Sequence, residues 1–385
     1  METSINKREK TEVAGVFNVC MEQIVGQQNL CHTQLQALGD IATCRTANMG
    51  GHINTCNHCG FKQQAYNSCH NRNCPKCQFL KQEQWVDKLK GRLIPGRYFH
   101  IVFSIPHLLN QLFYINQAIC YKLLFDAASG ALRNAGRNHN FLGAETGAVA
   151  VLHTWGQTLS YHPHIHMLVP AGGLSEDGIE WIAAHKKFFV PVKALSKMFR
   201  GILIRLLKEH ITENKLKLPD GFPWLQTLKE KLYKKNWNVY AKKVLRGVNS
   251  VLAYLGRYTH RVAISNNRLI NIKNGKVTFR YKNYRKKGKQ ETITITCIEF
   301  TRRFMMHVLP KGFYKIRYYG ILATANIKTK RQQAIALIGK TIWLPVLEGL
   351  TTYEVYRALR GTDPARCPKC KTGIMVKTES TTPPG

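Results

Sequence analysis

Three histidines stand at alternate positions in one short stretch, residues 161–169. Apolar residues fill the positions between and after them, which is the periodicity of a β-strand. His162, His164 and His166 therefore share one strand face, with neighbours about 6.6 Å apart and the outer two about 13 Å apart. Two neighbouring imidazoles can converge on one metal ion, whereas all three cannot unless the strand bends. Because Pro163 suits a strand start or edge, we predict that His164 and His166 form the ligand pair. A half-buried strand with hydrogen-bonded histidines is the alternative without metal.

A second strand is predicted over residues 148–157, and the short polar connection at 158–160 predicts that the two strands pair as a hairpin. His153 and Gln157 fall on one face of this earlier strand. Either of them could supply a third metal ligand, and His162 is a further candidate. For each of the three, an ordinary polar residue of the sheet is an equal alternative.

Cysteines crowd into residues 44–77, a Gly- and Asn-rich stretch with too little apolar content to stabilise itself by burial. Two C-x-x-C pairs with fourteen residues between them have nearly the spacing of structural zinc sites. The predicted zinc ligands are Cys56, Cys59, Cys74 and Cys77. Three more potential ligands, Cys44, His52 and Cys69, leave room for a second zinc ion. In such a two-site arrangement, Cys44 and His52 would complete the site of one C-x-x-C pair and Cys69 would add to the other.

Two tyrosines with arginines beside them form a third group of chemically capable residues. Tyr254 and Tyr258 are four residues apart, so on a helix they lie on one face. Arg257 and Arg261 each lie within one turn of a tyrosine. A phenol has a pKa near 10 and becomes a nucleophile only when a cation or a base stabilises the phenolate. Core packing is the alternative role for two tyrosines at this spacing.

The charge of the chain indicates a polyanionic partner. Its 385 residues contain 57 lysines and arginines against 22 acidic residues, a formal net charge of +35. Such an excess destabilises the fold through self-repulsion and usually serves the binding of a polyanion, with nucleic acid the first candidate and a membrane surface the weaker one. No stretch reaches the roughly 20 apolar residues of a membrane span, and the N-terminus is polar without a signal-peptide core. Cysteines in C-x-x-C pairs indicate metal binding rather than disulfides, so we expect a cytoplasmic protein associated with the nucleoid.

Basic and aromatic residues alternate in two later stretches, as in sites that stack bases and bind phosphates of single strands. The predicted DNA contacts there are Lys282, Tyr284, Arg285, Lys315 and Arg317. The first stretch follows a hairpin with its turn at Asn274-Gly275. The tail from about residue 362 is rich in Pro, Thr and Gly, so we expect it to be mobile, with one C-x-x-C pair that has no nearby partner.

The order of these motifs resembles the two-tyrosine HUH transposases of rolling-circle insertion sequences. The resemblance covers most of the chain and rests on three motifs. They are the cysteine stretch ending at Asn67–Gln78, the residues His153–Gln157 leading into His162–His166, and Tyr254–Arg261. Three motifs in the right order are far more specific than any one of them.

The resemblance implies a fold, an activity and cofactors. The implied α+β fold is an antiparallel HUH-endonuclease sheet flanked by helices, preceded by a small zinc-binding module. His164 and His166 would hold Mg²⁺ or Mn²⁺ on the scissile phosphate of single-stranded DNA, at the insertion-sequence ends and at the target. Tyr254 or Tyr258 would attack to leave a 5′-phosphotyrosine and a free 3′-OH. Arg257 and Arg261 would contact DNA, and Zn²⁺ would be structural.

The chain then divides into five expected parts. They are a helical segment at 1–40, a zinc-binding module at 41–92, a catalytic domain at 93–265, a basic DNA-binding region at 266–345 and a tail at 346–385. The catalytic domain would contain an insertion at about 174–246 and the tyrosine helix at about 247–263. A rolling-circle replication initiator or relaxase would share the histidines and tyrosines, and a non-catalytic zinc-containing DNA-binding regulator would share the cysteines and the charge.

Overall fold

The largest element of the fold is an antiparallel sheet of five strands, in the order β12-β4-β5-β3-β8. The computed structural model describes residues 11–27, 29–185, 190–222, 225–234, 237–243, 256, 263–342 and 344–383. The strands of the sheet are β3 (Tyr98–Ser104), β4 (Gly147–Trp155), β5 (Tyr161–Pro170), β8 (Val239–Lys243) and β12 (Ile316–Gly320). The predicted hairpin is present, since β4 and β5 are neighbours joined by a short turn.

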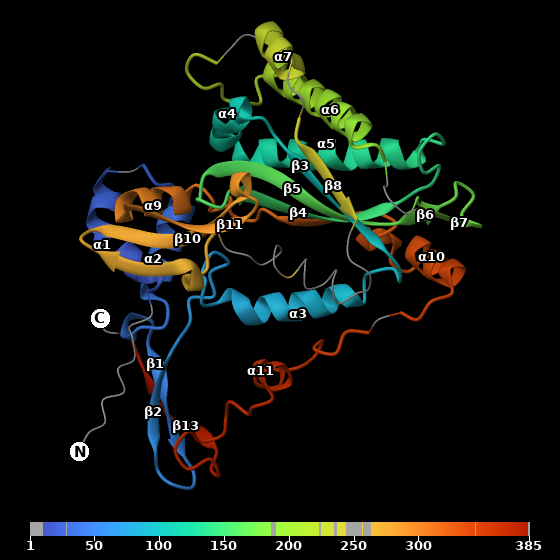
Figure 1. Cartoon of the computed structure of the whole chain (residues 1–385). Helices are drawn as coiled ribbons and strands as arrows, with labels where there is room; N and C mark the ends of the chain where they lie inside the picture. The colour runs from blue at the N-terminus through green and yellow to red at the C-terminus, as the bar shows by residue number, and fades with distance from the viewer. Residues whose placement is uncertain are drawn as a thin grey trace.

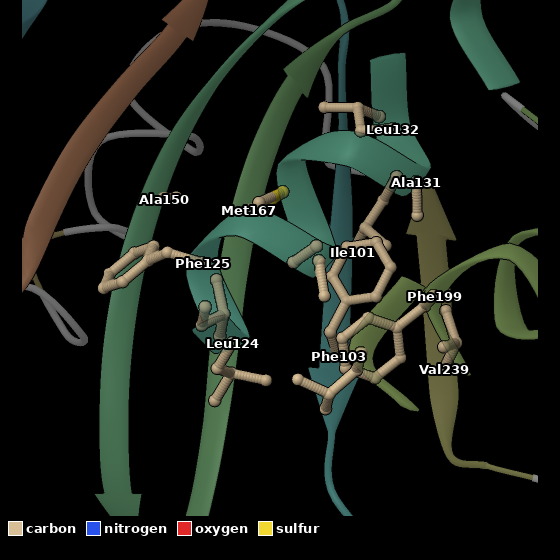
Figure 2. Close-up of a cluster of buried hydrophobic side chains, with 14 of the residues drawn as sticks. Ile101, Phe103, Leu124, Phe125, Ala131, Leu132, Ala150, Met167, Phe199 and Val239 are labelled. Carbon is tan, nitrogen blue, oxygen red and sulfur yellow. The ribbon is translucent and has the colours of Figure 1, made fainter. Parts of the chain in front are cut away.

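Helices cover one face of this sheet (Figure 1). They are α4 (Asn110–Ile115), α5 (Gln117–Arg137), α6 (Val192–Thr212) and α7 (Leu225–Lys234). Alternate residues of the strands point toward them, so Ile165 and Met167 are completely buried. Figure 2 shows the resulting core, in which the rings of Phe103 on β3 and Phe199 on α6 lie 5.0 Å apart. The apolar residues at alternate positions of β5 thus pack the sheet against its helices.

The opposite face of the sheet packs against α3 (Gln78–Lys90) and α10 (Lys330–Ile338). Leu89 of α3 is buried in one cluster with Val149 of β4 and Leu168 of β5. Val149 and Leu168 are direct cross-strand partners. Leu168 stands two positions after His166 in β5, so the two side chains point to the same face of the sheet. The histidines of β5 therefore belong to the face that α3 covers.

The N-terminal helices pack with a segment far along the chain. The members of this second body are α1 (Val13–Gln27), α2 (His32–Thr43), β9 (Leu269–Lys273), β10 (Lys276–Asn283), β11 (Lys289–Thr296) and α9 (Cys297–Met305). Phe17 of α1 meets Phe304 of α9 edge to face, with ring centroids 5.2 Å apart. Asn274 and Gly275, both with positive φ, make the predicted turn between β9 and β10. The structure thus joins two segments that the sequence analysis had placed in separate parts.

A third, small sheet has the order β13-β1-β2, from β1 (Gly51–Cys56), β2 (Lys62–Tyr66) and β13 (Met375–Thr381). The chain reaches it through α11 (Thr352–Arg360), which packs against α3. The remaining short elements are β6 (Gly172–Leu174), β7 (Trp181–Ala183), η1 (Ala47–Met49), η2 (His107–Leu109), η3 (Asn266–Arg268), η4 (Tyr284–Lys286) and η5 (Thr324–Asn326). The expectation of a mobile tail was wrong, because β13 pairs with β1 along its whole length.

The reading of residues 174–246 as an insertion was also wrong. β8 forms the edge of the central sheet beside β3, and α6 lies along α5 with Phe199 and Leu203 completely buried. The many basic residues of this segment favoured a solvent-exposed insertion, but its apolar residues pack into the main core. The predicted class itself, an antiparallel sheet flanked by helices with a cysteine-rich module before it, is confirmed. No helix in the described ranges is long and apolar enough to cross a membrane.

Candidate active site

Three histidines converge on one point of the face that α3 covers. His153 on β4 is the direct cross-strand partner of His164 on β5, and His166 is two residues further along β5. One ring nitrogen from each lies within 4.8 Å of the others. Two nitrogens bound to one ion at about 2.1 Å stand no more than about 4.2 Å apart, so small ring rotations bring all three into range. The hairpin register thus supplies a third imidazole without bending β5.

Hydrogen bonds and burial prepare this cluster for metal binding. The Nδ1 of His164 donates to the carbonyl oxygen of His162 over 2.6 Å, which leaves the Nε2 lone pair for a ligand. Burial, reinforced by the nearby His162, lowers the pKa of His164 to about 3. His164 is therefore neutral at physiological pH, the form that binds metals. On His166, Nδ1 and the Nε2 of His100 are hydrogen-bonded at 2.8 Å, which fixes the orientation of that ring.

The other two candidates for the third ligand lie to the side of the cluster. The Nε2 of Gln157 donates to the Tyr284 hydroxyl over 3.5 Å, and its Oε1 accepts from the Lys282 amide, so this side chain points toward β10. The His162 ring is centred 5.1 Å from that of His164 and 5.9 Å from that of His107. Of the three candidates, His153 is the one that joins His164 and His166.

His307 positions the hairpin, a role that sequence reasoning missed. Its Nε2 donates to the Leu159 carbonyl over 3.1 Å, and its Nδ1 accepts from the Thr154 hydroxyl over 3.1 Å. Because a carbonyl only accepts, these partners fix the neutral tautomer. Burial lowers the pKa of His307 to about 4, which agrees with that state. His307 thus ties the turn between β4 and β5 to the end of α9.

The predicted zinc ligands divide into two groups in the structure. The first group has its four sulfur atoms within 4.8 Å of one another and consists of Cys44, Cys69, Cys74 and Cys77. The Sγ of Cys77 lies 3.6 Å from that of Cys44 and 3.7 Å from that of Cys69. Hydrogen bonds from the Cys69 and Cys74 thiols hold the pKa of Cys77 well below its usual range. Four thiolates at this spacing match a tetrahedral zinc site.

The second group contains Cys56 and Cys59. The sequence left two arrangements open, namely one site shared with Cys74 and Cys77, or two sites with one pair joined by Cys44 and His52 and the other by Cys69. The structure separates the two pairs and puts Cys69 with Cys74 and Cys77, but it joins Cys56 and Cys59 to Cys367 and Cys370 of the C-terminal segment. His52 lies on β1 opposite Ser380 and is in neither group among the described residues. Cys367 and Cys370 are site residues that the sequence analysis did not assign, although their C-x-x-C spacing was the available signal.

The predicted nucleophiles, with the arginines beside them, fall outside the described residues; they are Tyr254, Arg257, Tyr258 and Arg261. Gly256, between the two tyrosines in the chain, is described and buried. A side chain added there would come within 3.0 Å of Cγ2 of Val86 and 3.6 Å of Nε2 of Gln82. Gly256 thus lies against α3, the helix on the histidine face.

The predicted DNA contacts occupy two different surfaces. Lys282, Tyr284 and Arg285 are exposed around η4, close to Gln157, and Tyr284 is 70% exposed. Arg317 instead stacks on the ring of Phe125 at 4.3 Å, on the face covered by α5. Burial and the nearby Arg72 lower the pKa of Lys315 to about 8. The exposed surface at η4 is therefore the better candidate for a strand of DNA.

A cavity of about 470 Å³ opens beside the histidines. Its lining includes His107 and His162 at one side and Lys231 and Lys234 of α7 at the other. Burial and the neighbouring His107 lower the pKa of His162. The cavity thus leads from a basic helix to the rim of the cluster.

Comparison with known proteins decides the family. Residues 16–105 match the model of a transposase zinc-binding domain, and residues 147–331 match that of a putative transposase. A putative transposase, y4qJ, from Sinorhizobium fredii is 41% identical, over 97% of this chain and 96% of its own length. This chain belongs to the IS91 family of transposases. The transposase for insertion sequence element IS801 from Pseudomonas savastanoi pv. phaseolicola is 28% identical, over 94% of this chain and 82% of its own length. No solved structure matches.

Membership in the IS91 family accounts for the two major parts of the chain. The zinc-binding match runs from within α1 to just past the end of β3 and includes all four cysteines of the first group. The putative-transposase match begins at β4 and includes all three clustered histidines and the tyrosine segment. The transposase therefore joins a zinc-binding domain to a domain that acts on DNA, and the replication-initiator and relaxase alternatives are set aside.

Proposed function

We propose that this IS91-family transposase nicks and rejoins single-stranded DNA at insertion-sequence ends through a 5′-phosphotyrosine intermediate. The observation that carries the proposal is the convergence of His153, His164 and His166 on the sheet face that α3 covers. Gly256, which stands between Tyr254 and Tyr258 in the chain, lies against the same helix. The metal-ligand cluster and Gly256, the one described residue between the candidate nucleophiles, are thus both next to α3.

The histidine cluster is suited to a divalent transition metal. Its donors are three imidazole nitrogens, and imidazole favours such ions, whereas Mg²⁺ prefers an all-oxygen environment. We therefore favour Mn²⁺ over Mg²⁺. When bound, the ion would act as a Lewis acid toward a phosphoryl oxygen of the scissile group.

The tyrosines would carry the covalent step. The phenolate oxygen of Tyr254 or Tyr258 attacks the phosphorus, the bond from phosphorus to the 3′-oxygen breaks, and the departing oxygen takes a proton to become a free 3′-OH. One phosphoester bond forms as another breaks, so no nucleotide cofactor is needed. The second tyrosine can accept a second strand, and the 3′-OH can later attack the phosphotyrosine to rejoin DNA.

Two surfaces next to the cluster would guide the strand. The exposed residues at η4 offer an aromatic ring between cations, which suits an unpaired base and its phosphates. They lie beside Gln157, two residues beyond Trp155, whose ring stacks on His153 with centroids 4.7 Å apart. On the other side, the cavity at His162 and His107 is large enough for a nucleobase. Both surfaces suit a flexible single strand.

The test is covalent capture of labelled single-stranded DNA from the ends of the element. Purified transposase is incubated with this DNA and Mn²⁺ or EDTA, and then separated on a denaturing gel. We expect a Mn²⁺-dependent shifted band that is lost in His164→Ala and in the double variant Tyr254→Phe/Tyr258→Phe. The single Tyr→Phe variants identify the tyrosine that attacks first.

Matched variants at exposed positions control for general damage. His139→Ala and Tyr314→Phe change the same residue types on the surface, so both should retain the adduct. If DNA binds but no adduct forms on any end sequence with Mn²⁺, the proposal fails and a non-catalytic DNA-binding regulator becomes the better description.

A further inference from the structure

The cysteines outside the zinc-binding match meet two cysteines inside it. Cys367 and Cys370 precede β13, and this strand pairs with β1, which ends at Cys56. The Sγ atoms of Cys56 and Cys370 lie 3.7 Å apart, and those of Cys59 and Cys367 lie 3.8 Å apart. All four sulfur atoms are within 4.8 Å of one another.

These distances fit a shared ion. A disulfide requires two sulfur atoms about 2.05 Å apart, which neither pair approaches. Four sulfur atoms bound to zinc at about 2.3 Å stand about 3.8 Å apart along the edges of a tetrahedron. The sulfur pairs of the second group match this edge, as do those of the first group at 3.6 and 3.7 Å.

Backbone amides point at the sulfur atoms as they do in zinc knuckles. The amides of His58 and Cys59 both donate to the Sγ of Cys56 over 3.4 Å, and the amide of Gly373 donates to the Sγ of Cys370 over 3.3 Å. Such bonds stabilise the thiolate form that zinc requires. A side chain added at Gly373 would collide with the Sγ of Cys56, so the two halves fit only with glycine at this position.

The small sheet has little else to hold it together. The seven residues of β13 are all exposed or half-buried, and in β1 the four residues between its buried ends are half-buried. The paired strands belong to segments 314 residues apart, so no short turn of the chain holds them together on the side of β13. An ion bound by both segments would supply that interaction.

We propose that Cys56, Cys59, Cys367 and Cys370 bind a second structural zinc ion, which fastens the C-terminal segment to the N-terminal zinc-binding domain. Half of its ligands lie outside the matched domain. The segment that it fastens runs back across α3. There the carboxylate of Asp87 accepts hydrogen bonds from the amides of Val346 and Leu347 over 2.8 and 2.6 Å. The second zinc ion thus holds the far end of a strap across the outer side of the helix that meets Gly256.

Zinc content of the full-length transposase tests this proposal without reference to DNA cleavage. In a His164→Ala background, which excludes the histidine site, we expect mass spectrometry to find two zinc ions per chain, and only one when Cys367→Ser/Cys370→Ser is added. Cys31→Ser, which removes an exposed cysteine outside both groups, should retain two. Gly373→Val leaves every sulfur atom in place, but it should also lower the zinc content to one ion per chain.

Hydrogen exchange shows whether the loss is local. In Cys367→Ser/Cys370→Ser we expect β13 to lose protection while β4 and β5 keep theirs. One zinc ion in the His164→Ala chain, or two when Cys367→Ser/Cys370→Ser is added, would overturn the proposal, and the first count decides even if the cysteine variant fails to fold. Because no readout involves cleavage, this result is independent of the phosphotyrosine mechanism.

Discussion

The histidine cluster and the cysteine groups are both sets of metal ligands, but the chain builds them in opposite ways. His153, His164 and His166 come from one hairpin whose other face is completely buried against α5 and α6. In the first cysteine group, Cys44 and Cys74 are buried in the cluster formed with α1, α2 and α9. The strands beside the second group have few buried side chains, and that group joins cysteines about 310 residues apart. Packing holds the histidines in place before any ion binds, whereas the second cysteine group above all needs the ion to define the positions of its side chains.

This difference fits what each metal would do. A catalytic ion needs ligands at fixed positions with a coordination site left open for substrate, whereas a structural ion is enclosed by four thiolates. The ligands of the three-histidine cluster are oriented by hydrogen bonds to His162 and His100. In the first cysteine group the four sulfur atoms surround the metal position, so no site remains for substrate.

Removing metal should affect the cysteine module and the histidine sheet differently, and this is the largest effect that we expect. Zinc binding contributes about 10–16 kcal/mol to the folding of small zinc domains. With 1,10-phenanthroline, amides of residues 44–77 should therefore lose most of their hydrogen-exchange protection, while those of β3, β4 and β5 keep it. Hydrogen exchange followed by mass spectrometry measures both regions in one sample.

Adding Zn²⁺ back should restore protection at residues 44–77, which controls for irreversible damage. If the central strands exchange as fast as the cysteine module after chelation, then the histidine face also depends on metal and the contrast fails.

The residues themselves explain why sequence reasoning located the histidines better than the zinc sites. Strand alternation placed His164 and His166 on one face without further information. The choice of His153 over Gln157 required the hairpin register, which shifts between His153 and Trp155 at a bulge and leaves Gln157 beside β10. Alternation cannot reveal such a shift, so the third ligand stayed open.

The zinc pairing depended on contacts that no local pattern encodes. The spacing of the two C-x-x-C pairs left open whether they share one zinc ion or bind two, and it did not show that β13 brings Cys367 and Cys370 to Cys56 and Cys59. The same limit applies to the fold, where α1 and α2 pack against α9 rather than forming a separate part. Periodicity predicted most elements, including the turn at Asn274-Gly275, but not which distant elements meet.

A second prediction concerns His307, which belongs to the packed region. Its ring nitrogens form hydrogen bonds with protein groups and are not part of the metal-ligand cluster. Replacing it with Asn would leave the Thr154 hydroxyl and the Leu159 carbonyl without their partner, at a cost of about 2–4 kcal/mol. Chemical denaturation at pH 7.5 measures this loss. His139→Asn, an exposed control, should change the free energy of unfolding by no more than about 0.5 kcal/mol.

The pKa of His307 adds a dependence on pH to this prediction. An unfolded histidine takes up its proton near pH 6.5, whereas the buried His307 does so only near pH 4. The unfolded state therefore binds more protons between these values, so stability is fully present above pH 6.5 and falls as the pH drops toward 4. His307 should account for about 3 kcal/mol of that fall. An equally steep pH dependence in His307→Asn would show that other groups cause it.

The smallest effect should come from single charges on the exposed surface at η4. Lys282→Ala or Arg285→Ala removes one cation from a surface with few packing contacts, so the melting temperature should not change. Each should lower the slope of log affinity for single-stranded DNA against log salt concentration by about 1 and weaken binding several-fold. Fluorescence anisotropy at four salt concentrations measures both quantities.

The matched control for these variants is Lys208→Ala, on the exposed side of α6 and across the sheet from the histidines. If the strand follows the histidine face, then Lys208→Ala should leave the slope unchanged. Equal losses of affinity in Lys208→Ala and Lys282→Ala would mean that the formal charge of +35 attracts DNA from all sides. If the affinity of the wild type did not depend on salt, the electrostatic argument would fail altogether. A difference between the two positions would place the DNA on the face where packing holds the histidines, the region that keeps its structure without metal.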